Sequence, residues 1–344
     1  MNIHILTENE LSQLRQLIDG SQHVVITAHK SPDGDAMGSA LAWADYLRQQ
    51  GKTAQIVLPD AYPDFLQWMP GSKEILRYDK KPDEVKAQLD AADLVCCLDY
   101  NELSRTEDLS PLIQDCKAPR VLVDHHLKPT VPCQLCISRP EMSSTSEMIF
   151  CIINQLGGYE AMTTETATCI YCGMMTDTGG FTYNSNRPEI FYIISLLLDK
   201  QVNKDKIYKR VYHNCSADCL RMRAHVILNK MRVSTELHTA YFTLSREDMK
   251  RYHYIKGDAE GLVNEPLKIK GMKLSISLRE DTEKDNLILV SLRSSCGFHC
   301  AKMATHFFNG GGHEDAAGGK LFCSLQEAEQ VVMRAVLAYR IQLK

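Results

Sequence analysis

Short apolar runs alternate with amphipathic stretches along the first half of the chain. Apolar runs of this length between helices are typical of parallel strands covered on both faces. Such runs occupy residues His23–Ala28, Thr53–Leu58, Leu94–Leu98 and Arg120–Val123. Helical spacing of apolar positions is found between them at Ala36–Gln50, Asp83–Ala91 and Leu109–Cys116. The pattern predicts an α/β fold with a doubly wound parallel sheet in the N-terminal region.

The second half of the chain has a different texture. Helices are expected at Ser143–Gly157 and Thr163–Thr176, and the stretch Glu189–Val233 is mostly helical in pattern. After Thr235, strand-like alternation appears at Ala240–Leu244, Met272–Leu278 and Leu287–Leu292, with helical patterns at Cys300–Phe308 and Leu325–Leu343. We therefore expect an N-terminal domain over residues 1–190, a helical connector over 191–232 and a smaller α+β domain over 233–344.

Composition narrows the class of protein. Of 344 residues, 44% are hydrophobic and 24% are charged, which is typical of a globular protein. The longest dense apolar run, Ile190–Leu198, is far shorter than the roughly 20 residues of a membrane helix. Residues Met1–Glu10 lack the basic and apolar regions of a signal peptide. We expect a cytoplasmic protein without a membrane partner. The net charge of −4 argues against a protein that tracks long duplex nucleic acid.

Cysteine spacing and a basic run each allow two interpretations. The pairs Cys133/Cys136 and Cys169/Cys172 have metal-ligand spacing, but the second lies in an expected helix and the first follows two prolines. Buried or edge thiols are therefore favoured over a zinc site. The stretch Lys200–Arg232 holds nine basic and two acidic residues. It is either a solvated helix face or a positive wall beside an anionic substrate.

Candidate metal ligands follow four of the apolar runs. His29 follows the first run and leads into Asp33-Gly34-Asp35, and Asp99 follows another. The remaining ligands are found in Asp124-His125-His126 and at Asp177, the end of an expected helix. In an open parallel sheet, ligands bind outside the carboxyl ends of the strands, so these groups are expected to converge. Each of them alone has an ordinary interpretation as a turn, a helix cap or a hydrogen-bonded core residue.

The negative charges of four carboxylates at one place need positive charge to balance them, because like charges at such distances do not all stay ionised. Two divalent cations would provide it. Oxygen and imidazole ligands suit Mn²⁺, with Mg²⁺ as a substitute. Two such ions, about 3.5–4 Å apart, can lower the pKa of a bridging water and hold a phosphoryl group.

A second set of candidates lies near the C-terminus. The sequence Phe308-Asn309-Gly310-Gly311-Gly312-His313 precedes Ala316-Ala317-Gly318-Gly319, and consecutive glycines let backbone amides approach an anion. Arg293 and Ser294 end an expected strand, where an arginine can bind a phosphate through two hydrogen bonds. A plain glycine loop and a surface arginine are the alternatives.

Together these segments resemble the DHH phosphoesterase superfamily with its DHH-associated C-terminal domain. The two-domain length is similar to the branch that trims short RNAs and dephosphorylates 3′-phosphoadenosine 5′-phosphate (pAp). The resemblance implies a catalytic domain followed by a substrate-binding domain, with the substrate in the cleft between them. It implies one Mn²⁺ on His29, Asp33 and Asp99, and a second on Asp35, Asp99, His125 and Asp177. It also implies support from Asp124, a phosphate contact from His126, and nucleotide contacts from Arg293, Ser294, Gly311, Gly312 and His313.

Two departures from the family pattern leave the preferred substrate open. Asn309 stands where the family commonly has the first glycine of the loop, and Gly180–Tyr183 lacks the basic residue often found there. The alternatives are a phosphodiesterase for dinucleotides such as pGpG and, ranked lower, a pyrophosphatase or exopolyphosphatase. A nucleotide sensor or RNA-binding module with an inactive site is the alternative outside enzymes. A homodimer is possible by resemblance alone.

Overall fold

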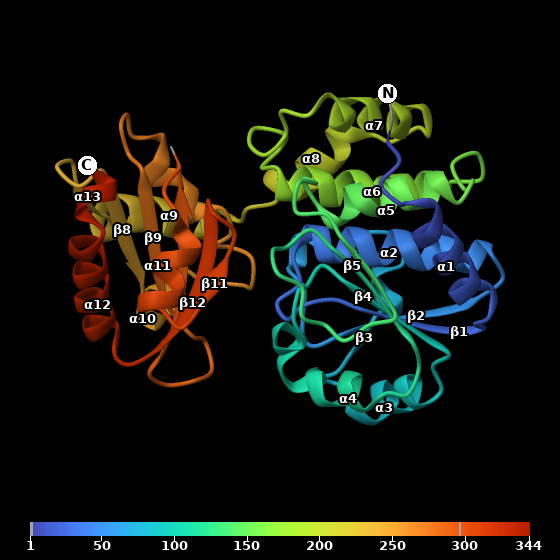
Figure 1. The fold of residues 1–344 in the computed structure, drawn as a ribbon. Coiled ribbons are helices and arrows are strands. Elements are labelled where there is room, and N and C mark those ends of the chain that lie inside the picture. The colour runs from blue at the N-terminus through green and yellow to red at the C-terminus, as the bar shows by residue number, and fades with distance from the viewer. Residues whose placement is uncertain (1–2, 296) are drawn as a thin grey trace. The chain divides into compact units, whose positions relative to one another are not determined.

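The computed structural model describes residues 3–295 and 297–344, which fold as two compact units that divide between Asn214 and Cys215 (Figure 1). The first unit holds a parallel sheet of six strands in the order β3-β2-β1-β4-β5-β6. Its strands are β1 His23–Thr27, β2 Thr53–Leu58, β3 Leu76–Arg77, β4 Leu94–Leu98, β5 Arg120–Asp124 and β6 Leu135–Ser138. The predicted α/β class and doubly wound sheet are confirmed.

Helices cover both faces of this sheet, as Figure 1 shows for α2 and α5 on one side and α3 and α4 on the other. The α-helices are α1 Glu8–Asp19, α2 Gly34–Gln49, α3 Pro82–Asp90, α4 Ser110–Asp115, α5 Thr145–Gln155, α6 Thr164–Asp177, α7 Pro188–Asp199 and α8 Lys204–Tyr212. Three short 3₁₀ helices are η1 Asp64–Leu66, η2 Ser72–Glu74 and η3 Leu103–Leu109.

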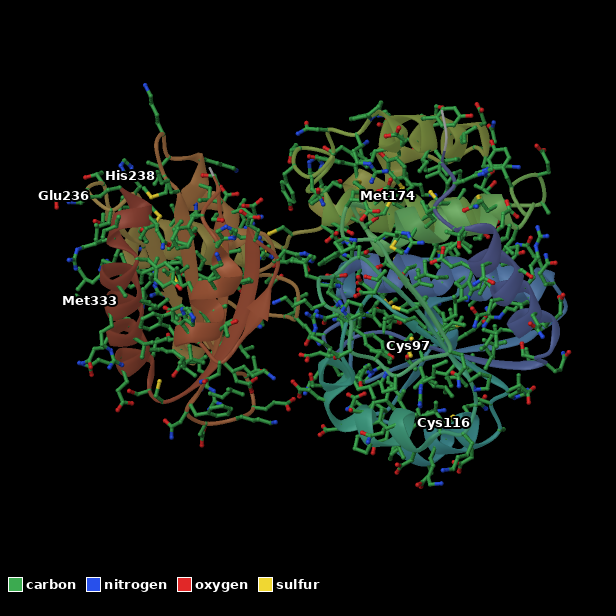
Figure 2. The ribbon with its side chains drawn as sticks, viewed as in Figure 1. Cys97, Cys116, Met174, Glu236, His238 and Met333 are labelled. Carbon is green, nitrogen blue, oxygen red and sulfur yellow. The ribbon has the colours of Figure 1, made fainter. Side chains whose placement is uncertain are left out.

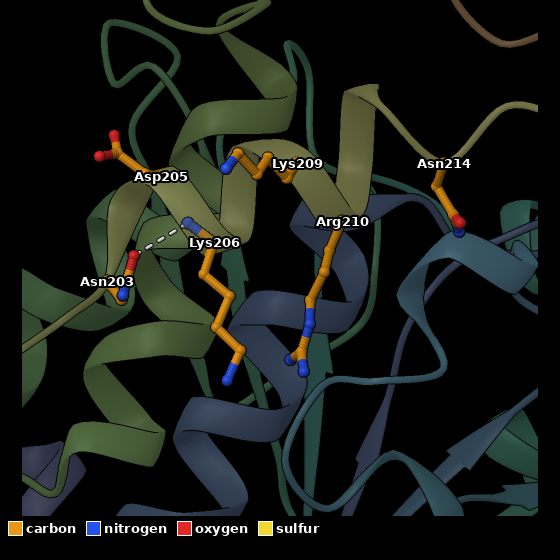
Figure 3. A pocket seen from close by; sticks show the side chains of 6 residues that line it. All are labelled: Asn203, Asp205, Lys206, Lys209, Arg210 and Asn214. Carbon is orange, nitrogen blue, oxygen red and sulfur yellow. Dashed lines mark hydrogen bonds between the residues drawn. The ribbon is translucent and has the colours of Figure 1, made fainter.

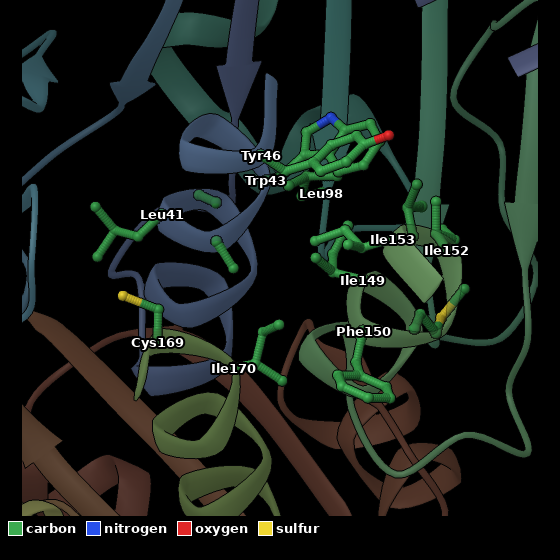
Figure 4. Close-up of a cluster of buried hydrophobic side chains, with 14 of the residues drawn as sticks. Leu41, Trp43, Tyr46, Leu98, Ile149, Phe150, Ile152, Ile153, Cys169 and Ile170 are labelled. Atoms are coloured by element: carbon green, nitrogen blue, oxygen red, sulfur yellow. The ribbon is translucent and has the colours of Figure 1, made fainter. Parts of the chain in front are cut away.

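Alternate residues of each strand enter different cores. Val24 and Ile26 of β1 pack with α2, α5 and α6, whereas Val25 packs with α3 and α4. Figure 4 shows Trp43 of α2 beside Leu98 and Ile149 in the larger of these cores. Because both faces are covered, the central residues of β1, β4 and β5 are apolar on both faces of the sheet, and polar residues stand mostly at the strand ends.

The second unit holds a mixed sheet in the order β11-β12-β10-β9-β8-β7, in which only the described pair β8–β9 is parallel. Its strands are β7 Arg232–Ser234, β8 Thr239–Leu244, β9 Leu274–Glu280, β10 Leu287–Ser294, β11 Gly311–Gly312 and β12 Ala316–Phe322. Its helices are α9 Ala217–His225, the π-helix η4 Val226–Lys230, α10 Arg246–Arg251, the 3₁₀ helix η5 Leu262–Lys268, α11 Cys300–Phe307, α12 Leu325–Ala338 and α13 Arg340–Leu343. The glycine-rich segment expected as a loop includes strands β11 and β12.

The connector expected over residues 191–232 is divided between the two units. Ile193 and Leu197 of α7 pack into the core of the first unit, and α8 belongs to the same unit. Met222 of α9 packs with Phe242 of β8 in the second unit. The division lies between Asn214 and Cys215, because the apolar faces of these helices are buried in different cores.

The cysteines of the described residues form no disulfide. Cys169 and Cys172 lie in the core on α6, as expected from their helical spacing, and Figure 4 shows Cys169 beside α2. Cys97 lies within the first unit and Met333 on α12 of the second in Figure 2. No helix among the described residues has the length and apolar character that crossing a membrane requires.

Candidate metal-binding active site

The predicted ligands meet at the carboxyl edge of the parallel sheet. Strands β1 and β4 are neighbours at its centre, and the chain leaves them toward opposite sides. This is the switch point at which open α/β sheets form a binding crevice. His29 follows β1, Asp99 follows β4 directly, and His125 follows β5.

His29, Asp33 and Asp99 form one group of potential ligands. Nε2 of His29 lies 3.5 Å from Oδ2 of Asp99 and 3.8 Å from Oδ2 of Asp33. The three residues can offer ligand atoms that all lie within 4.8 Å of one another. Asp33 is also the N-cap of α2, where its side chain accepts hydrogen bonds from the amides of Asp35 and Ala36.

His125, Asp35 and Asp177 form a second group around the other oxygen of Asp99. Nε2 of His125 lies 3.5 Å from Oδ1 of Asp99, 3.6 Å from Oδ2 of Asp177 and 3.9 Å from Oδ2 of Asp35. Helices α2 and α6 pack closely enough to bring Asp35 and Asp177 together, because a Cβ at Gly38 would lie 2.6 Å from the carbonyl oxygen of Cys169. Asp99 therefore stands between the two groups.

The two candidate metal-ligating histidines, His29 and His125, present the same ring nitrogen to the carboxylates. Nδ1 of His29 lies 2.8 Å from the carbonyl oxygen of Lys30, and Nδ1 of His125 lies 3.4 Å from that of Met142. A carbonyl oxygen only accepts, so each Nδ1 carries the proton. In the neutral ring Nε2 then has a lone pair that points at carboxylate oxygens. A cation between them satisfies both partners, and backbone orientation of this kind is common behind metal-bound histidines.

The N-terminus of α5 holds the acidic ligands in place. Oδ2 of Asp35 accepts from the amide of Thr145 at 2.7 Å, and Oδ1 accepts from that of Ser146 at 2.8 Å. The hydroxyl of Thr145 donates to Oδ1 of Asp99 at 3.0 Å. These residues are not among the candidates predicted from the sequence. The sequence shows a run of five polar residues at Ser143–Glu147, but only the structure shows that all five are buried.

Glu147 fixes the loop behind His125. Its Oε2 accepts from the amide and the hydroxyl of Ser143, each at 2.7 Å, and its Oε1 accepts from Nη2 of Arg187 at 3.0 Å. The carbonyl oxygen of Met142, which faces His125, belongs to this loop. The buried Glu147 carboxylate thus positions a ring that it does not touch.

Burial and crowding perturb the ionisation of the site. Burial, together with the charges of Asp99 and Asp177, raises the pKa of Asp35 well above its usual value. Burial also opposes ionisation of Asp99, but hydrogen bonds that His125 and His29 donate from Nε2 when their rings carry both protons outweigh it and hold the pKa of Asp99 well below the usual range. Positive charge is therefore favoured among these carboxylates, and the donor set fits divalent cations that prefer oxygen and imidazole.

Asp124 lies behind His126. Oδ1 of the fully buried Asp124 accepts from Nδ1 of His126 at 2.7 Å, and that nitrogen lies 3.9 Å from Oδ1 of Asp99. The other oxygen of Asp124 is buried and has no hydrogen-bond partner among the described residues. His126 is thereby held at the edge of the cluster of candidate metal ligands.

The C-terminal candidates gather at one end of the second sheet. Arg293 pairs with Ala316 across β10 and β12, and the carbonyl oxygen of Ala316 accepts from the amide of His313 at 2.7 Å. Ser294 donates through its hydroxyl to the carbonyl oxygen of Phe298 at 2.6 Å. Gly311 and Gly312 form β11, opposite Gly318 and Ala317.

Most glycines of this segment are required by packing. A Cβ at Gly310 would lie 1.9 Å from the carbonyl oxygen of Gly318, and one at Gly319 would lie 2.3 Å from that of Phe308. Gly312 has a φ of +142°, and a Cβ there would lie 2.5 Å from the carbonyl oxygen of Ala316. A Cβ at Gly311 would meet nothing within 4 Å. Only Gly311 of these four lacks a packing reason to be glycine.

Two family models match the chain. The DHH family, N-terminal domain, matches residues 23–174, and the DHHA1 domain matches residues 240–336. The chain is 28% identical over 314 residues to the bifunctional oligoribonuclease and PAP phosphatase NrnA of Thermus thermophilus, covering 91% of this chain and 89% of that protein.

Solved structures are also similar. An exopolyphosphatase-related protein from Bacteroides fragilis shares 43% sequence identity, with a TM-score of 0.93 and 98% of each chain covered. RecJ from Thermus thermophilus, in complex with Mn²⁺, shares 12% identity with a TM-score of 0.56, over 99% of this chain and 56% of that one. At that identity the likeness to RecJ concerns the fold alone.

Proposed function

Because the chain belongs to the DHH family, whose members are metal-dependent phosphoesterases and thus hydrolases, we propose that it cleaves short oligoribonucleotides to mononucleotides and pAp to AMP. The observation that carries the proposal is the position of Asp99, whose two oxygens each lie 3.5 Å from a different histidine Nε2. The relative from Thermus thermophilus, which is named for both activities, supports the choice of substrate.

We assign the ligands to two Mn²⁺ ions, with Mg²⁺ as a substitute. The first set is His29, Asp33 and Asp99, and the second is Asp35, Asp99, His125 and Asp177, which agrees with the two groups in the structure. When bound, two such ions supply an activated water and neutralise charge on the phosphoryl group.

The chain's own residues orient this site. The amides of Thr145 and Ser146 fix both oxygens of Asp35, so that carboxylate presents a set direction to its ligand position. The hydrogen bond to Asp124 fixes the ring of His126. We assign to His126 a contact with the substrate phosphate, and to Asp124 the positioning of that ring.

In the second unit we assign nucleotide binding to Arg293, Ser294, Gly311, Gly312 and His313. Two observations support this assignment. These residues lie at the same end of the second sheet, and a Cβ at Gly311 would meet no atom within 4 Å. The guanidinium of Arg293 suits a phosphate because it can donate two hydrogen bonds to it. The cytoplasmic location and a homodimer stay predictions.

A panel of substrates tests the function. Product release would be measured from pAp, a five-nucleotide RNA, pGpG and inorganic polyphosphate, each with Mn²⁺ and with chelator. The proposal expects Mn²⁺-dependent turnover of the first two substrates and little of polyphosphate, which the name of the Bacteroides fragilis relative keeps as a second candidate. Exclusive turnover of polyphosphate or pGpG would replace the proposal, and metal binding without turnover of any substrate would favour a sensor.

A further inference from the structure

A basic pocket lies on α8, outside the metal-ligand cluster. It has a volume of about 470 Å³ and is lined by Asn203, Asp205, Lys206, Lys209, Arg210 and Asn214 (Figure 3). Pockets of ~300–1,000 Å³ accommodate small ligands or parts of larger ones. Figure 3 shows Lys206 and Arg210, one helical turn apart, extending from the same side of α8.

The pocket carries positive charge that its own residues leave largely uncompensated. Among the described residues, Lys206, Lys209 and Arg210 form no ion pair. The acidic residue of the pocket, Asp205, is paired at 2.8 Å with Lys204. Three cations with one engaged carboxylate favour an anionic ligand.

Arg210 is held in place rather than free in solvent. Its guanidinium lies 4.7 Å from the centre of the Trp68 ring, and the residue is only partly exposed. A cation over an aromatic face is stabilised by the ring quadrupole. A fixed guanidinium also loses less conformational entropy when it binds, so this contact prepares Arg210 for an anion.

Contacts of α8 connect the pocket to segments that lie at the same edge of the sheet as the metal-ligand cluster. Trp68 lies just after η1, in the segment that follows the carboxyl end of β2. In that segment Asp60 accepts from the amide of Ser31 at 2.7 Å, within the turn between His29 and Asp33. At the C-terminal end of α8, Tyr212 donates to the carbonyl oxygen of Met175, two residues before Asp177.

We propose that this pocket binds a backbone phosphate of an oligoribonucleotide, beyond the nucleotide that is being cleaved. The proposal rests on the proposed function, since it names a second contact for the same substrate. A phosphodiester backbone fits because each nucleotide brings one negative charge, and basic grooves bind single strands in this way. The small substrate pAp is too short to use such a contact.

The test compares two substrates in a charge-neutral variant. The double substitution Lys206→Gln/Lys209→Gln changes exposed side chains and spares the contact of Arg210 with Trp68. The matched control is Lys80→Gln/Lys117→Gln, which removes two exposed charges that form no ion pair among the described residues of the same unit. Values of kcat/KM would be measured with pAp and with a five-nucleotide RNA at several salt concentrations.

We expect kcat/KM for the five-nucleotide RNA to fall about 5- to 20-fold in the pocket variant, with pAp responding as it does in the control. The slope of log kcat/KM against log salt should become shallower by roughly 0.7 for each phosphate that the variant no longer binds. An equal change for both substrates, or none for the RNA, would overturn the proposal. An equal change would instead indicate a regulatory nucleotide site.

A binding measurement separates this proposal from the proposed function. Fluorescence anisotropy would follow a labelled five-nucleotide RNA on Asp99→Asn protein, with and without the two lysine substitutions. Weaker binding in the lysine variant supports the pocket even if the chain cleaves neither substrate. Equal affinity of the two proteins contradicts the pocket even if the enzyme cleaves both.

Discussion

Nε2 of His125 lies 3.5 Å from Oδ1 of Asp99, while the other oxygen of that carboxylate faces the first ligand group. One side chain thus belongs to two groups of ligands. Asp99 directly follows β4 and has a φ of +63°, a conformation that aspartate tolerates better than most residues. This backbone turn at the end of a central strand lets a single carboxylate serve both groups.

Replacing this shared ligand should therefore affect both metal positions. In Asp99→Asn we expect kcat to fall by about 10³-fold or more, because several kcal/mol of charge stabilisation in the transition state is lost. Bound Mn²⁺, measured by elemental analysis, should fall below one ion per chain. Asp115→Asn, at an exposed acidic position, is the control. Near-normal turnover in Asp99→Asn would remove this residue from the site.

The hydroxyl of Thr145 gives a subtler test. Thr145→Val keeps the shape of the side chain and removes the 3.0 Å hydrogen bond to Asp99, whereas Thr145→Ser retains a donor. Hydrogen bonds to charged groups contribute about 1.5–3 kcal/mol, so we expect a roughly 10- to 100-fold loss of Mn²⁺ affinity in the valine variant. Isothermal titration with Mn²⁺ measures this. Equal affinities in the two variants would show that the hydroxyl does not position Asp99.

Two neighbouring glycines should respond in opposite ways to alanine. Gly310→Ala forces a Cβ to within 1.9 Å of a carbonyl oxygen, so Tm should fall by several degrees. Gly311→Ala meets no atom within 4 Å, so Tm should be retained. If Gly311 approaches the substrate, its variant should raise KM for pAp. A wild-type KM together with a wild-type Tm would leave Gly311 outside the binding site.

The partly buried carboxylate of Glu10 predicts that the folded protein loses part of its stability in acid. Burial alone would raise the pKa of Glu10, but hydrogen bonds from Arg139 and Thr7 outweigh it and hold that pKa below its usual value. A carboxylate with a lowered folded-state pKa stabilises the protein above the unfolded pKa of about 4.3, and this stability is lost as the pH falls through the folded pKa.

Urea unfolding of wild type and Glu10→Gln at pH 6.5 and pH 3 measures the effect. We expect wild type to be more stable by about 1 kcal/mol at the higher pH, the size of a partly exposed pair. The difference should shrink at the lower pH. A gap that stays constant between the two pH values would assign the loss to packing rather than to charge.

The sequence is sufficient to predict which histidine and aspartate side chains meet at the edge of the sheet, because most of them follow the ends of apolar runs. The sheet brings such positions together whatever the details of packing. The roles of Thr145 and Glu147 could not be predicted because they depend on which loop meets the N-terminus of α5, a tertiary relationship. The division of the helical connector depends likewise on which core each helix face joins.

The glycine-rich segment near the C-terminus forms a hairpin where the sequence predicts a loop. The sequence predicts a loop that approaches an anion, but a β11–β12 hairpin accounts for Gly310, Gly312 and Gly319 through packing. Asn309, which replaces a family glycine, has a φ of +48°. Its side-chain Nδ2 donates to the carbonyl oxygen of Lys320 at 3.1 Å. Asparagine adopts this conformation more readily than most residues, so the departure leaves the turn intact.

Crystals grown with Mn²⁺ and measured for anomalous scattering test the central claim most directly. The account predicts two manganese peaks about 3.5–4 Å apart. One peak should contact His29 and the other His125, and both should contact Asp99. A single peak, peaks away from these residues, or none at saturating Mn²⁺ would contradict the shared-carboxylate site.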